Sequence, residues 1–234
     1  MGLPGLFENF TAAGGNFVTP VEDLKKKVAQ CRAIVFDWDG VFNAGRKGHT
    51  SSSGFSEADS MGTNMLRYGL WRRLGELPYA AIISGEDNEN AIAFAGREHL
   101  TAAYTGMRDK RQVIAHLCDK HDLEPGQIAC VFDDINDLPM ARMCGLRFRV
   151  RRQASPMFAD FADRREFCDY VTGANASSYA VREVCELLLG LMDSYADVIE
   201  SRIAHDDAYE EYFRARQSVV TDCYGQRGDV IEKL

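Results

Sequence analysis

The chain has 234 residues, of which 46% are hydrophobic and 26% charged, an ordinary composition for a globular protein with one sizeable core. Its formal net charge of −8 argues against a nucleic-acid partner, because no basic excess exists to neutralise phosphates. No apolar stretch approaches the ~20 residues that span a bilayer, so we expect no membrane partner. The first residues lack the basic and apolar regions of a signal peptide, and we expect a cytoplasmic protein.

The pattern along the chain predicts three regions. Residues 1–20 are aperiodic and predict a loose leader, and residues 21–29 predict a short helix. Apolar runs and helical spacing then alternate as far as about residue 190. We therefore expect a leader with a short helix at 1–29, a core at 30–190, and a C-terminal helical extension and tail at 191–234.

Continuous apolar runs in the core region predict strands that are buried on both faces. In chain order these runs are 33–36, 80–83, 102–104 and 128–132, with shorter ones at 148–150 and 170–171. Helical spacing lies between them, around 61–66 and, after a predicted Asp109 cap, over 113–118. Strands that alternate with helices indicate βαβ units, so we predict an α/β fold with a doubly wound, mostly parallel sheet.

The remaining segments predict additions to this sheet. Residues 41–56 are rich in Gly, Ser, Asn and Thr, and we predict a β-hairpin flap there. The interval between Asp39 and Gly85 is too short for a large cap domain. Residues 180–203 predict a long helix whose apolar face is either core or an interface, 206–220 a further helix, and 221–234 a polar tail.

Polar or charged side chains follow the main predicted strands. Ligands bind at the carboxyl ends of strands in such a sheet, so these side chains should meet at one edge. Each group alone has an ordinary explanation, such as a turn, a helix cap or a solvated side chain; their order after successive strands is what indicates a shared site. In chain order they are Asp37 and Asp39, then Ser84 and Gly85, then Lys110, then Asp133, Asp134 and Asp137.

This set matches what phosphoryl transfer to a carboxylate requires. A phosphate monoester dianion repels an attacking carboxylate, so positive charge must lie between them. Asp37, Asp39 and Asp133 can supply oxygens to one Mg²⁺, which prefers octahedral oxygen coordination. Lys110 adds a positive charge near the phosphoryl oxygens, and the Ser84 hydroxyl can donate a hydrogen bond. One carboxylate is then available as a nucleophile and another as a general acid and base.

Order and spacing together resemble the haloacid-dehalogenase-like phosphatase superfamily, whose pattern is D-x-D-G, then Ser or Thr, then Lys, then an acidic pair. More narrowly, the chain resembles the small cap-less subgroup of sugar-acid phosphatases. That subgroup acts on 3-deoxy-manno-octulosonate 8-phosphate or, in relatives, on acylneuraminate 9-phosphate. The resemblance covers about residues 30–190, and the segments that carry it are 36–42, 55–62, 83–85, 109–110, 133–140 and 180–185.

The resemblance implies a Mg²⁺ cofactor and a role for each acidic residue that touches it. Asp37 would be the nucleophile and a metal ligand. Asp39 would be the general acid and base and would bind the metal through its backbone carbonyl. Asp133 would be the third protein ligand. The substrate would be a small phosphorylated metabolite, namely a sugar phosphate or a sugar-acid phosphate.

The resemblance also implies which residues hold the phosphate and support the site. Ser84, Gly85 and Lys110 would hold the phosphoryl group. Asp137 would orient Lys110 or a metal-bound water, and Asp134 would lie behind these ligands. Cap-less relatives cover their open site with a neighbouring subunit and a C-terminal tail, so the resemblance implies a homotetramer.

The chain departs from the subgroup at positions that are usually basic or glycine. Glu86 stands where the subgroup has Arg, Thr63 and Asn64 stand where it has a basic residue, and Phe132 replaces the Gly before the acidic pair. Those basic groups would recognise a sugar-acid carboxylate. The departures leave two expectations open: a less acidic substrate, or loss of activity.

Two other interpretations compete with a phosphatase. A receiver domain also gathers acidic residues and a Lys around Mg²⁺, but its Lys comes last, whereas Lys110 precedes the second acidic pair. A catalytically weakened homologue that serves as a binding or assembly protein is suggested by Glu86, Phe132 and the C-terminal extension. Retention of the phosphate-handling residues argues against this second interpretation.

Overall fold

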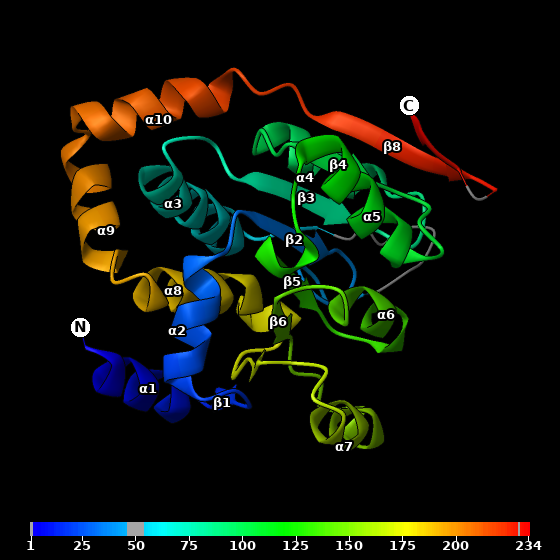
Figure 1. Ribbon diagram of the computed structural model, residues 1–234, viewed down its shortest axis with the longest axis horizontal. Helices are drawn as coiled ribbons and strands as arrows, with labels where there is room; N and C mark the ends of the chain where they lie inside the picture. The colour runs from blue at the N-terminus through cyan, green and yellow to red at the C-terminus, as the bar shows by residue number, and fades with distance from the viewer. Residues whose placement is uncertain (1, 46–53, 229) are drawn as a thin grey trace.

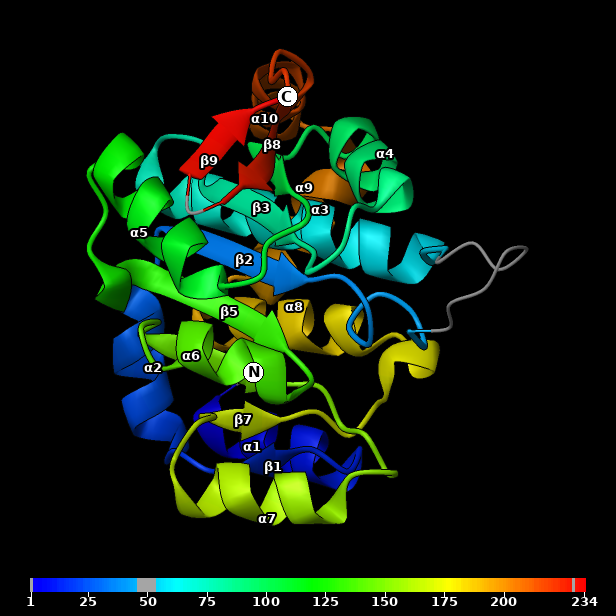
Figure 2. The same cartoon turned by 90° about the vertical axis from the view of Figure 1, so that its right-hand side faces the viewer.

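The computed structural model describes residues 2–45, 54–228 and 230–234. These residues form a sheet of nine strands in the order β1-β7-β6-β5-β2-β3-β4-β8-β9, with helices on both faces (Figure 1, Figure 2). Neighbouring strands run parallel except at the two edges, where β1 is antiparallel to β7 and β9 to β8. The predicted doubly wound, mostly parallel α/β fold is therefore confirmed.

Most strands lie where the apolar runs predict them, within three residues at each end. The strands are β1 (Asn16–Phe17), β2 (Ala33–Asp37), β3 (Tyr79–Ile83), β4 (Ala102–Tyr104), β5 (Ile128–Phe132), β6 (Leu146–Arg149), β7 (Tyr170–Val171), β8 (Asp222–Arg227) and β9 (Val230–Lys233).

Helices connect the strands, and three short 3₁₀ turns at Pro125–Gln127, Ile135–Asp137 and Ala176–Ser178 accompany them. The predicted Asp109 cap is confirmed, because its carboxylate accepts a hydrogen bond from the backbone N–H of Arg111 at 3.1 Å. The helices are α1 (Leu3–Ala12), α2 (Val21–Ala29), α3 (Glu57–Leu74), α4 (Glu89–Arg97), α5 (Lys110–His121), α6 (Leu138–Ala141), α7 (Pro156–Arg164), α8 (Ala180–Leu191), α9 (Tyr195–Ala204) and α10 (Asp207–Gln217).

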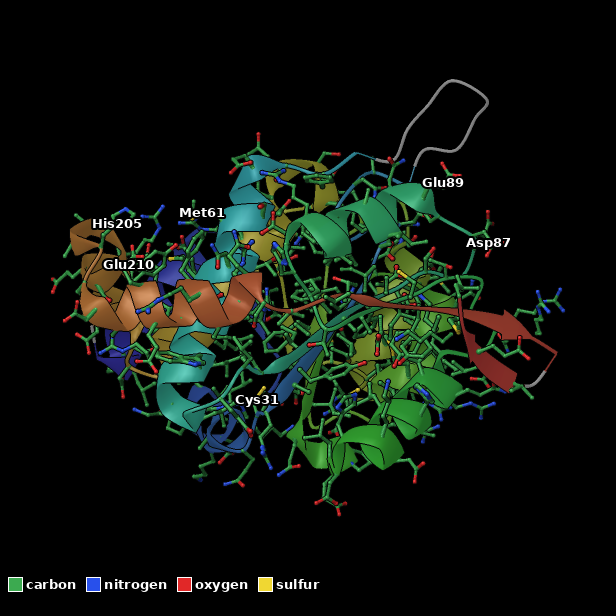
Figure 3. All side chains as sticks on the ribbon, turned by 90° about the horizontal axis from the view of Figure 1, so that it is seen from above. Cys31, Met61, Asp87, Glu89, His205 and Glu210 are labelled. Atoms are coloured by element: carbon green, nitrogen blue, oxygen red, sulfur yellow. The ribbon has the colours of Figure 1, made fainter. Side chains whose placement is uncertain are left out.

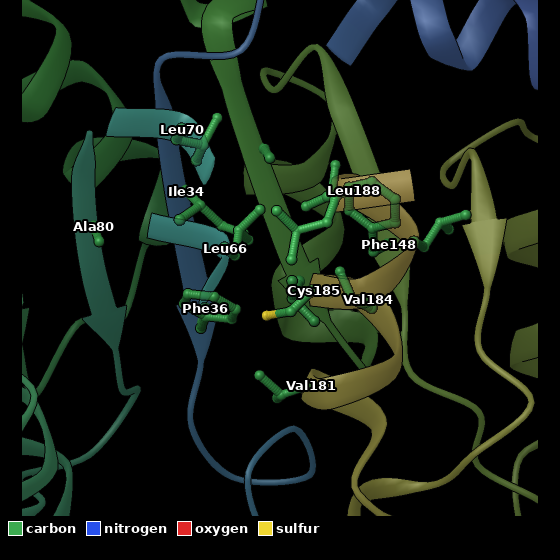
Figure 4. Close-up of a cluster of buried hydrophobic side chains, with 14 of the residues drawn as sticks. Ile34, Phe36, Leu66, Leu70, Ala80, Phe148, Val181, Val184, Cys185 and Leu188 are labelled. Carbon is green, nitrogen blue, oxygen red and sulfur yellow. The ribbon is translucent and has the colours of Figure 1, made fainter. Parts of the chain in front are cut away.

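Two hydrophobic clusters lie on opposite faces of the sheet. On β2, Ile34 and Phe36 belong to the cluster covered by α2, α3, α4 and α8, part of which Figure 4 shows. Ala33 and Val35 belong to the cluster covered by α5, α6 and α7. Alternate residues of one strand therefore enter different cores, which explains why the strand is apolar throughout.

Both terminal segments are more ordered than the sequence predicts. The predicted loose leader contains α1 and β1, and Leu6 of α1 is buried against α8, where a Cβ on Gly190 would lie 2.2 Å from the Leu6 Cδ1 atom. The predicted polar tail forms the β8–β9 hairpin, and β8 pairs in parallel with β4. Both predictions of irregular structure are wrong, because the strands β1, β8 and β9 are short and carry no continuous apolar run.

The long helix predicted over 180–203 is two helices, α8 and α9, separated by a turn in which Asp193 has a φ of 54°. The apolar face of α8 is buried in the first cluster through Val181, Val184 and Leu188 (Figure 4). Of the two alternatives for this face, core packing is the one observed.

Half of the predicted flap over 41–56 lies outside the described residues, which omit 46–53. Its first residues are core rather than flap: Val41 and Phe42 are buried, and the Phe42 ring stacks on Trp38 at a centroid distance of 5.1 Å. No cap domain is formed by the residues on either side of this gap. Within the described ranges, no helix is long and apolar enough to cross a membrane.

Candidate active site

A pocket of about 430 Å³ lies at the carboxyl edge of the sheet, where the main strands end. Its walls come from the connections that follow β2, β3, β4, β5 and β6. All the site residues predicted from the sequence line this pocket, with the exception of Ser84. The lining residues are Asp37, Asp39, Gly45, Gly85, Glu86, Met107, Arg108, Lys110, Asp133, Asp134, Asn136, Asp137 and Arg152.

Lys110 joins the end of β2 to the loop after β5. It is the first residue of α5, and its buried ammonium donates hydrogen bonds to Asp37 Oδ1 and, at 2.5 Å, to Asp137 Oδ1. Burial disfavours the ammonium, but the charges of Asp37 and Asp137 outweigh this and raise the pKa of Lys110. Lys110 is therefore a fixed cation between two carboxylates, and the predicted contact of Asp137 with Lys110 is present.

The loop after β5 is held in shape by its own carboxylates. Asp137 Oδ2 accepts hydrogen bonds from the backbone N–H groups of Asp133 at 3.4 Å and Asp134 at 3.1 Å. The Asp134 carboxylate in turn accepts from the N–H of Ile135 at 2.7 Å and begins the short 3₁₀ turn. These bonds direct the side chains of Asp133 and Asp137 into the pocket, as the lining shows.

Asp37, Asp133 and Asp137 form a buried cluster in which one carboxylate oxygen of each lies within 4.8 Å of the others. Burial raises the pKa of Asp37 to about 7, with Asp137 adding to the rise and Lys110 opposing it. Burial, and then the charge of Asp37, raise the pKa of Asp133 to about 8, against the opposing effect of Arg152. These two carboxyl groups therefore keep their protons to a higher pH than an exposed Asp does.

This donor set fits a divalent cation. Buried, closely spaced carboxylate oxygens are the ligands that Mg²⁺ prefers, and a bound cation would favour their ionised forms. The whole lining also favours a cation, because it contains six carboxylates and three cationic side chains. A phosphate dianion would enter such a pocket only after its negative charge had been reduced.

Asp39 and Gly40 follow β2 in a tight turn organised by Asn43. The backbone N–H of Gly40 donates to Asn43 O at 3.0 Å, and Asn43 Oδ1 accepts from Gly45 N at 2.8 Å. Gly40 has a φ of 89°, and a Cβ there would lie 2.1 Å from Asp133 Oδ2. The glycine of the D-x-D-G motif is thus required both by its conformation and by the close approach of Asp133. Asp39 lines the pocket beside it.

Ser84 and Gly85 hold the end of β3 next to the pocket. Ser84 is buried, its Oγ accepts from Glu86 N at 3.3 Å, and its carbonyl accepts from Met107 N at 3.0 Å. These contacts tie the β3 end to the loop before α5. Gly85 is exposed and lines the pocket, which leaves room for a ligand against its backbone.

Two arginines of the pocket were missed by the sequence reasoning. Arg152, beyond β6, pairs with Asp133 and, at 2.9 Å, with Asp134. Arg108 lies two residues before Lys110, and its side chain has no ion pair within the described part of the chain. The signal for Arg152 was available, because it follows the predicted strand at 148–150 just as the other site residues follow theirs.

The segment 55–62, part of the sequence resemblance, is structural rather than part of the pocket. The Asp59 carboxylate is buried and accepts from the backbone N–H of Arg182 at 2.9 Å, in the first turn of α8. A Cβ on Gly62 would lie 2.9 Å from Arg182 Cδ, so the glycine permits close packing of α3 on α8. Asn64 also lies away from the pocket, where its Oδ1 accepts from the Tyr212 hydroxyl of α10 at 2.8 Å.

Comparison with curated proteins decides the family. The chain is 31% identical over 189 residues to the 3-deoxy-D-manno-octulosonate 8-phosphate phosphatase KdsC of Escherichia coli, a match that spans 76% of this chain and 91% of the relative. The same enzyme of Yersinia pestis is 28% identical over 183 residues, with coverage of 74% and 87%. The chain belongs to the KdsC-like phosphatases of the haloacid-dehalogenase superfamily. No family model matches the sequence.

Solved structures of KdsC-like phosphatases share this fold. A probable phosphatase of the YrbI family from Pseudomonas syringae is 28% identical, with a TM-score of 0.65 and coverage of 78% of this chain and 98% of that one. KdsC from Moraxella catarrhalis, solved with magnesium, phosphate and its sugar acid, has a TM-score of 0.65 at 24% identity and covers 77% and 98%. The membership excludes the receiver-domain interpretation.

Proposed function

We propose that this protein is a Mg²⁺-dependent phosphatase that hydrolyses the phosphate ester of a small sugar acid through an aspartyl-phosphate on Asp37. The observation that carries the proposal is the buried arrangement of Lys110 against Asp37 and Asp137, next to Asp133. The names of the KdsC relatives support the same reaction class. We assign this activity to the core at 30–190, with 1–29 and 191–234 as flanking regions.

Asp37, Asp133 and the backbone carbonyl of Asp39 would hold the cation, with Asp137 close behind them. A bound Mg²⁺ supplies positive charge that allows a phosphate dianion to approach an ionised Asp37. The Lys110 ammonium would bind a phosphoryl oxygen. Its second carboxylate contact, to Asp137, keeps it charged and in place.

In the first step an oxygen of the Asp37 carboxylate attacks phosphorus, and the ester P–O bond breaks. The leaving alkoxide takes the proton of the Asp39 carboxyl group, so the products are the sugar alcohol and an aspartyl-phosphate. In the second step the Asp39 carboxylate takes a proton from water, whose oxygen attacks phosphorus. The bond between phosphorus and Asp37 breaks, and phosphate leaves with both carboxyl groups restored to their starting states.

Gly85 and the two arginines of the pocket would contribute to substrate binding. The exposed backbone of Gly85 and the Lys110 side chain would hold the phosphoryl group. The hydroxyl of Ser84, which is buried beside the pocket, would assist them, as the sequence predicts, after a small rearrangement. Arg108 and Arg152 bring positive charge to a pocket whose motif has Glu86 in place of a basic residue. Arg108, which has no ion pair within the described residues, favours an anionic substrate over a less acidic one, and this agrees with the sugar-acid phosphate named for the relatives.

The catalytically weakened homologue is not favoured. Phe132 is buried in the second hydrophobic cluster under the pocket, and the acidic loop after it keeps its hydrogen bonds. A homotetramer and a cytoplasmic location stay predictions. Light scattering at micromolar concentration tests the first, and a monomer there would remove it; cell fractionation tests the second, and recovery with the membranes would remove it.

The decisive experiment is a phosphatase assay against a panel of sugar and sugar-acid phosphates, with Mg²⁺ and with a chelator. We expect phosphate release that requires Mg²⁺, is fastest for a sugar-acid phosphate, and falls by at least ~10³-fold in Asp37→Asn, which removes the nucleophile. Folded protein that releases no phosphate from any member of the panel would contradict the proposal.

A further inference from the structure

Arg152 occupies a carboxylate that the proposed metal site needs. Its guanidinium contacts Asp133 Oδ2 through Nη2, and Asp134 Oδ2 at 2.9 Å through Nη1. The Asp133 side chain is 2% exposed, whereas that of Arg152 is 36% exposed. A buried carboxyl group is therefore contacted by a partly exposed guanidinium that also lines the pocket.

The backbone just before Arg152 is held by hydrogen bonds to neighbouring segments. The N–H of Val150 donates to Phe132 O at 2.8 Å, which continues the pairing of β6 with β5. Arg151 donates through its backbone N–H to Thr172 Oγ1 at 3.0 Å and through Nη2 to Gly14 O at 2.8 Å. Arg152 follows these anchors directly, so its position over Asp133 is a consequence of the fold.

The two cations paired in the pocket divide the carboxylates between them. Lys110 contacts Asp37 and Asp137, and in the described part of the chain the cation paired with Asp133 is Arg152. Without the guanidinium, Asp133 would be a buried carboxyl group beside Asp37 and Asp137 with no ion-pair partner there, and a proton or a metal ion would have to neutralise it.

We propose that Arg152 is an internal counter-ion of the metal site, which pairs with the ionised form of Asp133 in the metal-free protein and lowers the affinity of the pocket for a divalent cation. A cation at Asp133 repels the nearby guanidinium, so binding proceeds by exchange. Asp134 gives Arg152 a second, half-exposed partner that it keeps when the contact with Asp133 weakens. The inference rests on the proposed function, because it takes Asp133 as a metal ligand.

The proposal predicts that loss of Arg152 tightens metal binding, whereas loss of a merely structural residue would weaken it. We expect Arg152→Gln and Arg152→Met each to bind Mg²⁺ and Mn²⁺ roughly tenfold more tightly than the natural chain, since a partly exposed ion pair is removed from the metal-free state alone. The measurement is titration calorimetry on the purified full chain after chelator treatment, at about pH 9, where protons compete least with the metal for Asp133. Cation addition should also raise the Tm of these variants more than that of the natural chain.

Arg108→Gln is the matched control, because it removes the same charge from the same pocket without breaking an ion pair to Asp133. Its metal affinity should change by clearly less than that of the Arg152 variants. Folded Arg152 variants with equal or weaker affinity would overturn the inference, as would an equal tightening in Arg108→Gln. If the natural chain binds no cation, the metal-dependent function fails as well; if it binds and only the tightening is absent, the inference alone fails.

Discussion

At the residue scale, the pocket shares few cations among many carboxylates. Lys110 serves Asp37 and Asp137, and Arg152 serves Asp133 and Asp134. A shared cation only partly offsets the burial of each partner, so the pKa values of Asp37 and Asp133 stay raised, at about 7 and about 8. The two carboxyl groups can therefore be neutralised further by protons or by a divalent cation, and protons and the cation compete for them.

Gly40→Ala tests whether catalysis requires the close approach of Asp133 to the D-x-D-G turn. A Cβ at Gly40 would lie 2.1 Å from Asp133 Oδ2 and 2.5 Å from Arg152 Nη2, so Asp133 must move. We expect kcat to fall by roughly 10²-fold, because a displacement of about 1 Å at a reacting centre has effects of this size. Steady-state kinetics on the best substrate of the panel gives the measurement.

Gly75→Ala is the control for that variant. Gly75 ends α3 with a φ of 74°, and nothing lies within 4 Å of a Cβ built on it. The substitution should destabilise the protein by about 1–2 kcal/mol through the left-handed conformation and leave kcat unchanged. A Gly40→Ala variant as active as Gly75→Ala would show that the turn tolerates displacement of Asp133.

At the element scale, the C-terminal hairpin reaches the loop that carries Arg108. The Gln226 side chain on β8 accepts from the backbone N–H of Arg108 at 2.9 Å and donates to Gln112 Oε1 at 2.9 Å. The helices α9 and α10 lie far from the pocket. His205 and Glu210 are at the opposite end of the molecule from Asp87, the residue that follows Glu86 of the pocket (Figure 3). Of the C-terminal elements, the hairpin is the one that bears on the pocket.

Gln226→Ala should therefore affect substrate binding more than chemistry. Loss of the two hydrogen bonds loosens the backbone at Arg108, and we expect KM for a sugar-acid phosphate to rise up to about tenfold with a smaller change in kcat. Gln217→Ala, on the exposed end of α10, should change neither constant. Equal KM values for the two variants would mean that the hairpin does not position the pocket loop.

The sequence predicted the secondary-structure elements and site residues correctly where burial on both faces produces a continuous apolar run. The central strand β5 is apolar throughout, and β2 is apolar up to its terminal Asp37, because both faces of these strands are covered. Since ligands bind at the carboxyl ends of such strands, the positions of Asp37 and Asp133 could be predicted. The same patterns could not locate β1, β8 and β9, because these strands of two to six residues, at or next to the edges of the sheet, depend on partner strands rather than on apolar runs. Arg152 follows the predicted strand at 148–150, so its place at the site could be predicted, but its contact with Asp133 could not, because that contact depends on the folded arrangement of two loops.

At the scale of the whole molecule, the acidic pocket links stability to pH. The folded-state pKa values of Asp37 and Asp133 lie above the usual value of 3.8, so the folded protein favours their protonated forms. The stability that protonation contributes is fully present below about pH 3.8 and is lost as pH rises through about 7 and 8. The histidines with lowered pKa values, His116 and His121, act in the opposite direction but only around and below their ordinary pKa of 6.5.

We therefore expect the Tm of the metal-free protein to fall between about pH 6.5 and about pH 8.5, where the histidines no longer titrate. Mg²⁺ should reverse this trend, because it binds the ionised carboxylates and its stabilising effect grows as they lose protons. Differential scanning calorimetry over this pH range, with chelator and with Mg²⁺, measures how Tm depends on pH in each case.

Asp133→Asn is the control for this pH dependence. It removes the group whose pKa is about 8, so the fall in Tm toward pH 8.5 should become shallower in the metal-free variant. A metal-free natural chain whose Tm is constant or rises over this interval would contradict the raised pKa values.

The order of strands in the sheet has a consequence for how the molecule fluctuates. Of the nine strands that the described residues form, β2 stands at the centre with β5 beside it, and the two antiparallel strands stand at the margins. Fraying begins at margins, where each strand has one neighbour, and β1 is held to β7 through two residues only. Breathing at either side can thus expose backbone amides to exchange while the strands that carry Asp37 and Asp133 remain paired, which keeps the reactive carboxylates in register during partial opening.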